Sequence, residues 1–249
     1  MESDARDILI DVRDVWKSFN GQAVLRGVSL QVRAGASEVI LGRSGIGKSV
    51  LLKSIVGLLV PEAGSIRVKG EEVVGLGPRQ LNRIRRNIGY VFQYAALYDS
   101  MTVRENLEFP LRKLTDLPED EIARRVEEQL RLVDLAEAID RMPSELSGGM
   151  RKRVGLARAI ITRPAIVLYD EPTAGLDPMT AHDISDLMVD LARRFGITSI
   201  TVTHDLQCAH IVADRISILE GGVFTHQGTY EELRKLEDPL VRAFFQAVT

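Results

Sequence analysis

The sequence predicts an α/β fold with a parallel sheet, and three observations carry this prediction. An apolar strand, Ser37 to Leu41, runs into a glycine-rich loop and then into an apolar helix. From Ala165 onward, strand-like and helix-like patterns alternate, as they do in βαβ units. A chain of 249 residues is long enough to bury a full core as one domain, 1–249, with a smaller subdomain inside it.

The first third is expected to open with strands. Ile8 to Phe19 and Val24 to Val32 alternate between apolar and polar residues and flank an Asn-Gly turn, which indicates an antiparallel hairpin. The helix after the glycine-rich loop is expected over Val50 to Leu59, and Pro61 marks its end.

The middle third is expected to be mostly helical. Short strands are predicted at Ser65 to Val68 and Ile88 to Phe92, and the basic segment between them predicts a solvated helix face with Arg83, Arg85 and Arg86. Four apolar residues of the segment 119–133 fall on one stripe of a helix: Ile122, Val126, Leu130 and Val133.

The last third returns to the α/β pattern. The strand IVLYD, at 166–170, is followed by a helix whose apolar residues are in phase: Ile184, Leu187, Met188, Leu191 and Phe195. A strand SITVT, at 199–203, and a final strand pair around Arg215 to His226 complete the predicted sheet.

Composition excludes several classes of protein. The formal net charge of -3 gives no global attraction to nucleic acid, so no nucleic-acid partner is expected. Cys208 is the only cysteine, which excludes an intrachain disulfide and a cysteine-based zinc site. The N-terminus lacks the basic-then-apolar order of a signal peptide, and the apolar stretches fall far short of the ~20 residues that span a bilayer.

A phosphate-binding loop is predicted at GRSGIGKS, residues 42–49, which fits G-x-x-x-x-G-K-[ST] at every fixed position. Its glycines, Gly42, Gly45 and Gly47, let backbone N–H groups turn toward the phosphates of a nucleoside triphosphate. Lys48 supplies a point charge, and the Ser49 hydroxyl is placed to bind Mg²⁺.

Polar residues that follow predicted strands complete the candidate catalytic set. Asp170 closes the strand IVLYD and is expected to hold Mg²⁺ through water, while Glu171 points differently and is the candidate general base. Gln93 is a candidate ligand of Mg²⁺ or water, and His204 is expected to reach a γ-phosphate oxygen.

A second anion cradle is predicted at Ser147, Gly148 and Gly149, a serine-capped glycine turn that opens a helix. Because the chain has one phosphate loop but two cradles, we expect two copies to stack head to tail, so that the second cradle serves the nucleotide of the other copy. The cations of the segment 151–153 are unusual at the positive end of a helix dipole, and an incoming anion favours them.

In this order the motifs resemble those of the ATP-binding subunit of ABC transporters. They are Walker A at GRSGIGKS, the Q-loop at Gln93, the signature at LSGGM, Walker B at IVLYDE, the D-loop at AGLD and the H-loop at His204. The resemblance covers essentially the whole chain. It implies a P-loop NTPase of the ABC-ATPase type: a RecA-like core, an antiparallel β-subdomain from the N-terminal hairpin, and an inserted helical subdomain at 95–161.

The resemblance also implies roles for individual residues. Phe19 stands where an aromatic ring stacks on adenine, and Asp177 of the D-loop is expected at the dimer interface, where it helps to shape the opposite site. The expected ATP contacts along Walker A are Gly42, Arg43, Ser44, Gly45, Ile46, Gly47, Lys48, Ser49 and Val50. The expected ligands of Mg²⁺ are Ser49, Gln93 and Asp170.

Two departures from the commonest family pattern suggest the transported substrate. Met150 and Val50 replace polar residues that many members have in the signature and Walker A. This pairing resembles the ATPases of Mla/Mce-type systems, which move phospholipids or related lipids between membranes, and the segment DPLVRAFFQAV resembles their C-terminal ends. The function implied is ATP hydrolysis that powers lipid transport through a separate permease.

The implied partners follow from this resemblance. They are a second copy of the chain, a membrane permease that docks at about Tyr94 to Leu111, an Mce/MlaD-type lipid-binding subunit and a small accessory subunit. The implied location is the cytoplasmic face of the inner (plasma) membrane. Another ABC transporter, for small-molecule import or lipoprotein release, stays open, as does a soluble ABC ATPase such as one for iron–sulfur assembly. A role for ATP as a dimerising ligand only is disfavoured, because Glu171 and His204 are both present.

Overall fold

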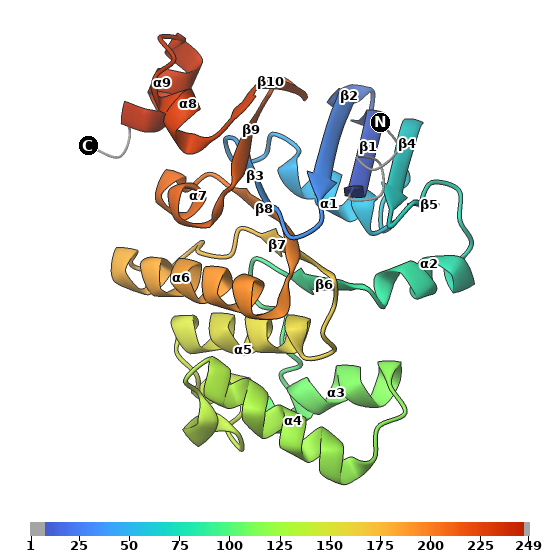
Figure 1. Cartoon of the computed structure of the whole chain (residues 1–249), viewed down its shortest axis with the longest axis vertical. Coiled ribbons are helices and arrows are strands. Elements are labelled where there is room, and N and C mark those ends of the chain that lie inside the picture. Colours follow the sequence, from blue (N-terminus) through green and yellow to red (C-terminus); the bar gives the residue numbers. More distant parts are fainter. Residues whose placement is uncertain (1–7, 247–249) are drawn as a thin grey trace.

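The computed structural model describes residues 8–246, which form two β-sheets flanked by helices (Figure 1). The smaller sheet is antiparallel, with the order β2-β1-β4-β5. Its strands are β1 (Ile8–Phe19), β2 (Gln22–Arg33), β4 (Ala63–Val68) and β5 (Glu71–Glu72). The predicted N-terminal hairpin is confirmed: β1 and β2 pair antiparallel around the two-residue turn between them, where both residues have positive φ, as a type I′ turn requires.

The larger sheet has the order β10-β9-β3-β8-β7-β6. Its strands are β3 (Ser37–Leu41), β6 (Ile88–Val91), β7 (Ile166–Asp170), β8 (Thr198–Thr203), β9 (Arg215–Glu220) and β10 (Val223–Gly228). All neighbouring strands pair parallel except β9 and β10, which form an antiparallel edge. The strands β3, β7 and β8 have no exposed side chain, so polar residues of β3 and β8 are buried together with the apolar ones.

Alternate side chains of the parallel strands enter two separate cores. Ile40, Leu168 and Val202 pack with α1 (Lys48–Ile55) and with the antiparallel sheet. Leu41 and Val167 belong to the other core, shared with α5 (Gly148–Ile160), α6 (Pro178–Phe195) and α7 (Leu206–Val212). The glycine-rich loop directly follows Leu41, so it lies at the carboxyl end of β3.

The predicted helical middle third holds α3 (Val103–Leu114), α4 (Glu119–Leu132) and two 3₁₀ turns (Ala136–Ala138 and Pro143–Glu145) before α5. In Figure 1, α3 and α4 form the lower end of the molecule, on the far side of α5 from the parallel sheet. The predicted apolar stripe is confirmed, since Ile122, Val126, Leu130 and Val133 are all buried. The remaining helices are α2 (Pro78–Arg85), α8 (Tyr230–Arg234) and α9 (Pro239–Gln246).

The expected end of the first helix is wrong. α1 ends at Ile55, four residues before Leu59, because Gly57 adopts a left-handed conformation with φ +66°. The amides of Leu58 and Leu59 then return to the carbonyl of Lys53, a wrapped C-terminal turn that stops the helix well before Pro61.

The expectation of a solvated basic face on α2 is wrong in part. Arg83 pairs with the exposed carboxylate of Glu71 at the surface. Arg85 instead donates from Nε to the carbonyl of Val56 at 2.8 Å and from Nη2 to that of Gly57 at 3.0 Å. These are carbonyls at the end of α1 that the helix itself cannot satisfy, so Arg85 caps a neighbouring helix.

Between residues 8 and 246, no helix combines the length and the apolar character that crossing a membrane requires.

Candidate functional site

The glycine-rich loop joins β3 to α1 as predicted. Gly47 has φ +112°, and a Cβ at this position would lie 2.6 Å from the side chain of Val24. A Cβ at Gly42 would lie 2.8 Å from the carbonyl oxygen of Leu219 on β9. The loop therefore needs glycine at both ends. Close packing requires it at Gly42 and Gly47, and the positive φ is a second reason at Gly47.

Lys48 points into this loop. Its Nζ donates to the carbonyls of Gly42 at 2.7 Å and Arg43 at 3.0 Å, and it forms an ion pair with Glu171 Oε1 at 3.0 Å. The side chain is only 4% exposed. This buried ammonium is held by loop carbonyls and one carboxylate, and it can form a charge-assisted hydrogen bond with a bound phosphate.

Asp170, the last residue of β7, and Glu171, which follows it, face different partners. Asp170 Oδ1 accepts a hydrogen bond from the hydroxyl of Ser49 at 2.6 Å. Glu171 has φ +49°, which turns its side chain away from the strand direction, and its Oε2 lies 2.9 Å from His204 Nδ1. One carboxylate thus faces the Ser49 hydroxyl, and the other faces Lys48 and His204.

Tyr90 was not predicted as a site residue. Its hydroxyl, on β6, donates to the second carboxylate oxygen of Asp170 at 3.1 Å. Burial and the charge of Asp170 raise the pKa of Tyr90 well above its ordinary value, so the phenol stays a donor. Tyr90 follows Gly89 in a short strand, and only the pairing of β6 with β7 brings it to the acidic pair.

A cavity of about 390 Å³ lies over the glycine-rich loop, and Asp170 is not among its lining residues. It is lined by Phe19, Val24, Ser44, Gly45, Gly47, Lys48, Ser49, Val50, Gln93, Glu171 and His204. The structure therefore brings together most of the predicted phosphate loop, the predicted catalytic residues and the predicted adenine-stacking ring. Phe19, at the end of β1, is 42% exposed, and Lys17 Nζ lies 5.2 Å from the centroid of its ring.

The donor set fits Mg²⁺. A hydroxyl, a carboxylate and an amide side chain are the hard oxygen ligands that this ion prefers, and Ser49 already contacts Asp170. Within the described part of the chain no group of three or more His, Cys, Asp or Glu residues is placed to hold a metal ion. A single carboxylate with water molecules and phosphate oxygens is the usual arrangement for Mg²⁺ at a nucleotide.

Ser147, Gly148, Gly149 and Asp177 are not among the described residues that line this cavity. Ser147 caps α5 by accepting from the Met150 amide at 3.3 Å, and Asp177 caps α6 by accepting from the Thr180 amide at 3.1 Å. A hydrogen bond from the Thr180 hydroxyl also lowers the pKa of Asp177. Both caps are on the surface.

The side chains of Arg151, Lys152 and Arg153 all donate to carbonyls of the chain itself. The Nη1 of Arg151 donates to the carbonyl of Leu146 at 2.5 Å, and the Nη1 of Arg153 donates to that of Val133 at 3.1 Å. Lys152 is buried and donates to the carbonyls of Gln93 at 2.5 Å and Glu171 at 3.2 Å. Burial lowers the pKa of Lys152 to about 8. Each cation therefore satisfies main-chain carbonyls.

The two residues that depart from the family pattern have packing roles in this structure. Met150 is half-buried against the core shared by α3 to α7. Val50 is half-buried against the core around α1 and also lines the cavity. Neither side chain carries a polar atom that could bind a phosphate.

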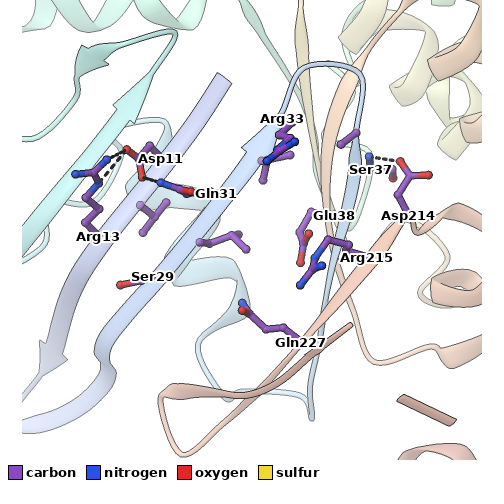
Figure 2. Close-up of a pocket in the computed structure, with 14 residues that line it drawn as sticks. Asp11, Arg13, Ser29, Gln31, Arg33, Ser37, Glu38, Asp214, Arg215 and Gln227 are labelled. Atoms are coloured by element: carbon purple, nitrogen blue, oxygen red, sulfur yellow. Dashed lines mark hydrogen bonds and ion pairs between the residues drawn. The ribbon is translucent and has the colours of Figure 1, made fainter. Parts of the chain in front are cut away.

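A separate cleft of about 690 Å³ lies between the two sheets, at the amino ends of β3 and β9. Figure 2 shows Glu38 and Arg215 next to each other in this cleft, with Asp11, Arg13 and Gln31 across it on the antiparallel sheet. None of the predicted site residues lines it. The candidate site is therefore the cavity at the opposite, carboxyl ends of the strands, where open α/β sheets bind ligands.

Comparison with known proteins agrees with this geometry. The family described as "ABC transporter" matches residues 25–174. The chain belongs to the ABC transporter family. It is an ABC transporter ATPase, with the P-loop NTPase fold that the sequence predicted.

Several relatives are similar over nearly the whole chain. The "Probable ribonucleotide transport ATP-binding protein mkl" of Mycobacterium leprae is 41% identical over 237 residues, 95% of this chain and 68% of that protein. The "Methionine import ATP-binding protein MetN" of Brucella abortus is 36% identical over 242 residues, 97% of this chain and 65% of that protein. This ABC protein spans about two thirds of the length of these relatives.

Two solved structures are similar in fold. The structure of cbiO1 from Clostridium perfringens, part of the ABC transporter complex cbiONQ, has a TM-score of 0.84 at 30% identity and covers 98% of this chain and 100% of its own. The ATP-binding cassette MJ0796, in a dimeric post-hydrolysis state bound to ADP and Pi, has a TM-score of 0.81 at 32% identity and covers 88% of this chain and 98% of its own.

Proposed function

We propose that this ABC protein hydrolyses ATP as a head-to-tail dimer with two shared sites and powers the transport of phospholipids or related lipids through a separate permease. The single observation that supports the dimer is that the two predicted phosphate cradles of one chain lie apart. The Walker A cavity contains Glu171 and His204, whereas Ser147 lies on the surface at the start of α5. The dimeric state of the MJ0796 cassette supports this proposal.

Different residues in and next to the cavity have different roles in the proposed hydrolysis. The loop amides and Lys48 bind the β- and γ-phosphates, and Phe19 stacks on adenine. Ser49, Gln93 and Asp170 hold Mg²⁺, which when bound neutralises charge on the phosphates. Glu171 accepts a proton from the attacking water, whose oxygen bonds to the γ-phosphorus as ADP leaves.

Two contacts of Glu171 prepare this step. His204 Nδ1 lies 2.9 Å from one carboxylate oxygen and fixes its direction, while Lys48 pairs with the other oxygen at 3.0 Å. Phosphate binding draws Lys48 toward the new anion, so the carboxylate becomes free to polarise water. Ser147, Gly148, Gly149 and Asp177 complete the site of the opposite copy in this proposal.

The chain, 1–249, is proposed to act as one ABC ATP-binding domain with 95–161 as its helical subdomain. The proposed permease contact is the segment 94–111, because Tyr94 and Tyr98 expose 85% and 43% of their surface there. The inner face of the same segment is core, since Val103, Leu107 and Leu111 are fully buried. Docking to a permease would hold the ATPase at the cytoplasmic face of the inner (plasma) membrane.

The lipid substrate rests on the pairing of Val50 with Met150 and on the resemblance of the C-terminal segment, whose last residues lie outside the described range. The partners proposed with it are an Mce/MlaD-type lipid-binding subunit and a small accessory subunit. The second candidate is small-molecule import, which the ribonucleotide and methionine names of the relatives favour.

The test is to solubilise the complex in detergent from the native membrane by means of a tag on this chain. Its lipids and protein subunits are then identified by mass spectrometry. The proposal predicts a multi-span permease, a lipid-binding subunit and a bound phospholipid, and ATPase activity of the purified complex that phospholipid stimulates.

Stimulation by methionine or a ribonucleotide instead of lipid would favour the second candidate. Recovery of the chain without any multi-span membrane protein would contradict both transport functions.

A further inference from the structure

One face of α5 lies directly against the segment that follows β6. Lys152, Gly155 and Arg158 are spaced at i, i+3 and i+6, so they share this face. Lys152 donates to the carbonyl of Gln93 at 2.5 Å, and Arg158 donates to that of Ala95 at 2.8 Å. Between them, a Cβ at Gly155 would lie 3.0 Å from the Cβ of Ala95. The helix and the segment 93–95 are therefore in tight contact.

Lys152 reaches a second functional segment with the same ammonium. Its Nζ donates to the carbonyl of Glu171 at 3.2 Å. Glu171 holds a left-handed conformation with φ +49°, which costs free energy for a residue other than glycine. A cation on its carbonyl offsets part of that cost, so Lys152 helps to define where the carboxylate of Glu171 points.

The burial of Lys152 argues for more than packing. Only 7% of the residue is exposed, and its two hydrogen-bond acceptors are main-chain carbonyls. Burying a charged group is costly unless its new hydrogen bonds compensate for the lost water. An apolar side chain would suffice if α5 only had to pack against the core.

We propose that Lys152 is a positioning residue that couples the signature turn to the catalytic loops of its own chain. Ser147 caps α5 in the turn that precedes Lys152, so an anion bound there acts on the N-terminus of the same rigid helix. A small shift of the helix is then carried by one ammonium to the carbonyls of Gln93 and Glu171. Anion binding at the signature turn thereby sets the position of the Glu171 carboxylate in the Walker A cavity of the same chain.

This inference rests on the proposed dimer. It assigns to Lys152 no contact with phosphate, metal or water. The neighbouring cation Arg153 offers a matched control, because its guanidinium donates to the Val133 carbonyl at 3.1 Å and to Asp134 at 3.2 Å, away from both catalytic loops.

The test compares Lys152→Met with Lys152→Arg and Arg153→Met in the full chain. For Lys152→Met, which removes both hydrogen bonds of the ammonium, we expect kcat to fall by at least about tenfold, with KM for ATP unchanged. ATP-driven dimer formation should persist. Lys152→Arg should recover most of the activity, and Arg153→Met should retain the wild-type kcat.

Hydrogen exchange adds a readout that a purely structural role would not move. In the wild type, ATP should slow amide exchange at 146–151 and at 92–96 together. In Lys152→Met, the protection at 146–151 should remain, while that at 92–96 should fall to what nucleotide in the chain's own cavity provides through Gln93, because the link to the signature turn is gone.

A kcat of Lys152→Met within about twofold of the wild type would overturn the inference, as would an equal loss in Arg153→Met. If Lys152→Met does not fold, Lys152→Gln replaces it, and it should lose part of the activity because one neutral donor remains. Wild-type kcat in Lys152→Gln, or failure of both variants to fold, would overturn the positioning role. If the wild-type chain itself neither dimerises with ATP nor hydrolyses it, the proposed function fails instead.

Discussion

At the scale of single residues, the carboxylate of Asp170 shows how side chains orient a candidate ligand of Mg²⁺. Its two oxygens are held by two different hydroxyl groups, one from Ser49 on α1 and one from Tyr90 on β6. The first hydroxyl is itself a candidate ligand of Mg²⁺. The second is not, so its contribution is to fix the direction of the carboxylate.

Tyr90→Phe is therefore expected to weaken the use of Mg²⁺. Loss of the hydroxyl leaves one oxygen of Asp170 without its donor, and outer-shell changes of this kind cost about tenfold in metal affinity. The concentration of Mg²⁺ at half-maximal hydrolysis should rise by that factor, while the melting temperature changes little. Tyr230→Phe, on α8, is the control. An unchanged Mg²⁺ requirement in Tyr90→Phe would remove Tyr90 from this role.

Glu38 provides a second prediction, in the cleft of Figure 2. Burial raises the pKa of its carboxyl above the usual range, although the Ser217 hydroxyl and Arg215 act in the opposite direction. The folded protein therefore keeps a proton that the unfolded chain has lost. Its contribution to stability is full at low pH and declines as the pH rises through the folded-state pKa.

Glu38→Gln should remove this decline, because the amide is neutral at every pH and its oxygen still accepts from Ser217. Thermal melting from pH 4.5 to 7.5 measures the effect as the difference between the variant and the wild type. The variant should gain relative stability as the pH rises. A difference that stays constant over this range would show that Glu38 ionises normally.

At the scale of elements, α5 contains two features that the proposed positioning role connects, the Ser147 cap and the buried Lys152. Its first turn is an exposed cap, with the Ser147 hydroxyl accepting from Met150. Its body reaches back to the catalytic loops through Lys152. In the proposed dimer, the same helix would bind phosphate of the opposite copy at its first turn, while its body contacts the segments that line the Walker A cavity.

Ser147→Arg is expected to abolish hydrolysis while leaving ATP binding to the isolated chain within about twofold, because Ser147 does not line the chain's own cavity. Loss of the cap should cost about 1 kcal/mol of stability. Fluorescent-nucleotide titration at low protein concentration and steady-state turnover separate the two effects. Ser147→Thr retains a capping hydroxyl and is the control. Loss of monomeric binding would contradict the assignment of Ser147 to the opposite site.

At the scale of the whole molecule, the helical end and the antiparallel sheet lie on opposite sides of the parallel sheet (Figure 1). Each contains one of the proposed nucleotide-binding residues: Phe19 lies in the antiparallel sheet, and Ser147 lies in the helical region. A head-to-tail pair of chains would bring such distant parts to one nucleotide. We therefore expect Glu171 to control how long the proposed dimer stays closed around its nucleotides.

Glu171→Gln is expected to trap the closed dimer. The amide cannot accept the proton, so turnover should fall by about 10² to 10⁴, the usual contribution of a general base. ATP binding should persist, because loss of the ion pair frees Lys48 for phosphate. Light scattering after size exclusion with ATP measures the dimer. Glu237→Gln, at an 89% exposed carboxylate, is the control, and steady-state turnover that matches the wild type would exclude Glu171 as the base.

Much of this architecture was predictable from amino-acid order. The hairpin, the five-residue strands β3 and β7 and the buried stripe of α4 follow from periodicity, turn residues and the length of apolar runs, which are local properties. The end of α1 was not predicted correctly, because Gly57 stops the helix before the more conspicuous Pro61 does.

The sequence was sufficient to select the phosphate loop, the acidic pair and the polar residues at strand ends, because these are short motifs whose chemistry lies in neighbouring residues. It could not assign partners to Tyr90, Arg85 or Lys152. Lys152 and Gln93 are 59 positions apart, and Tyr90 and Asp170 are 80 positions apart. Which main-chain carbonyl or carboxylate such a side chain reaches depends on the path of the whole chain, and so the three cations that follow LSGGM acquire their acceptors only in the folded protein.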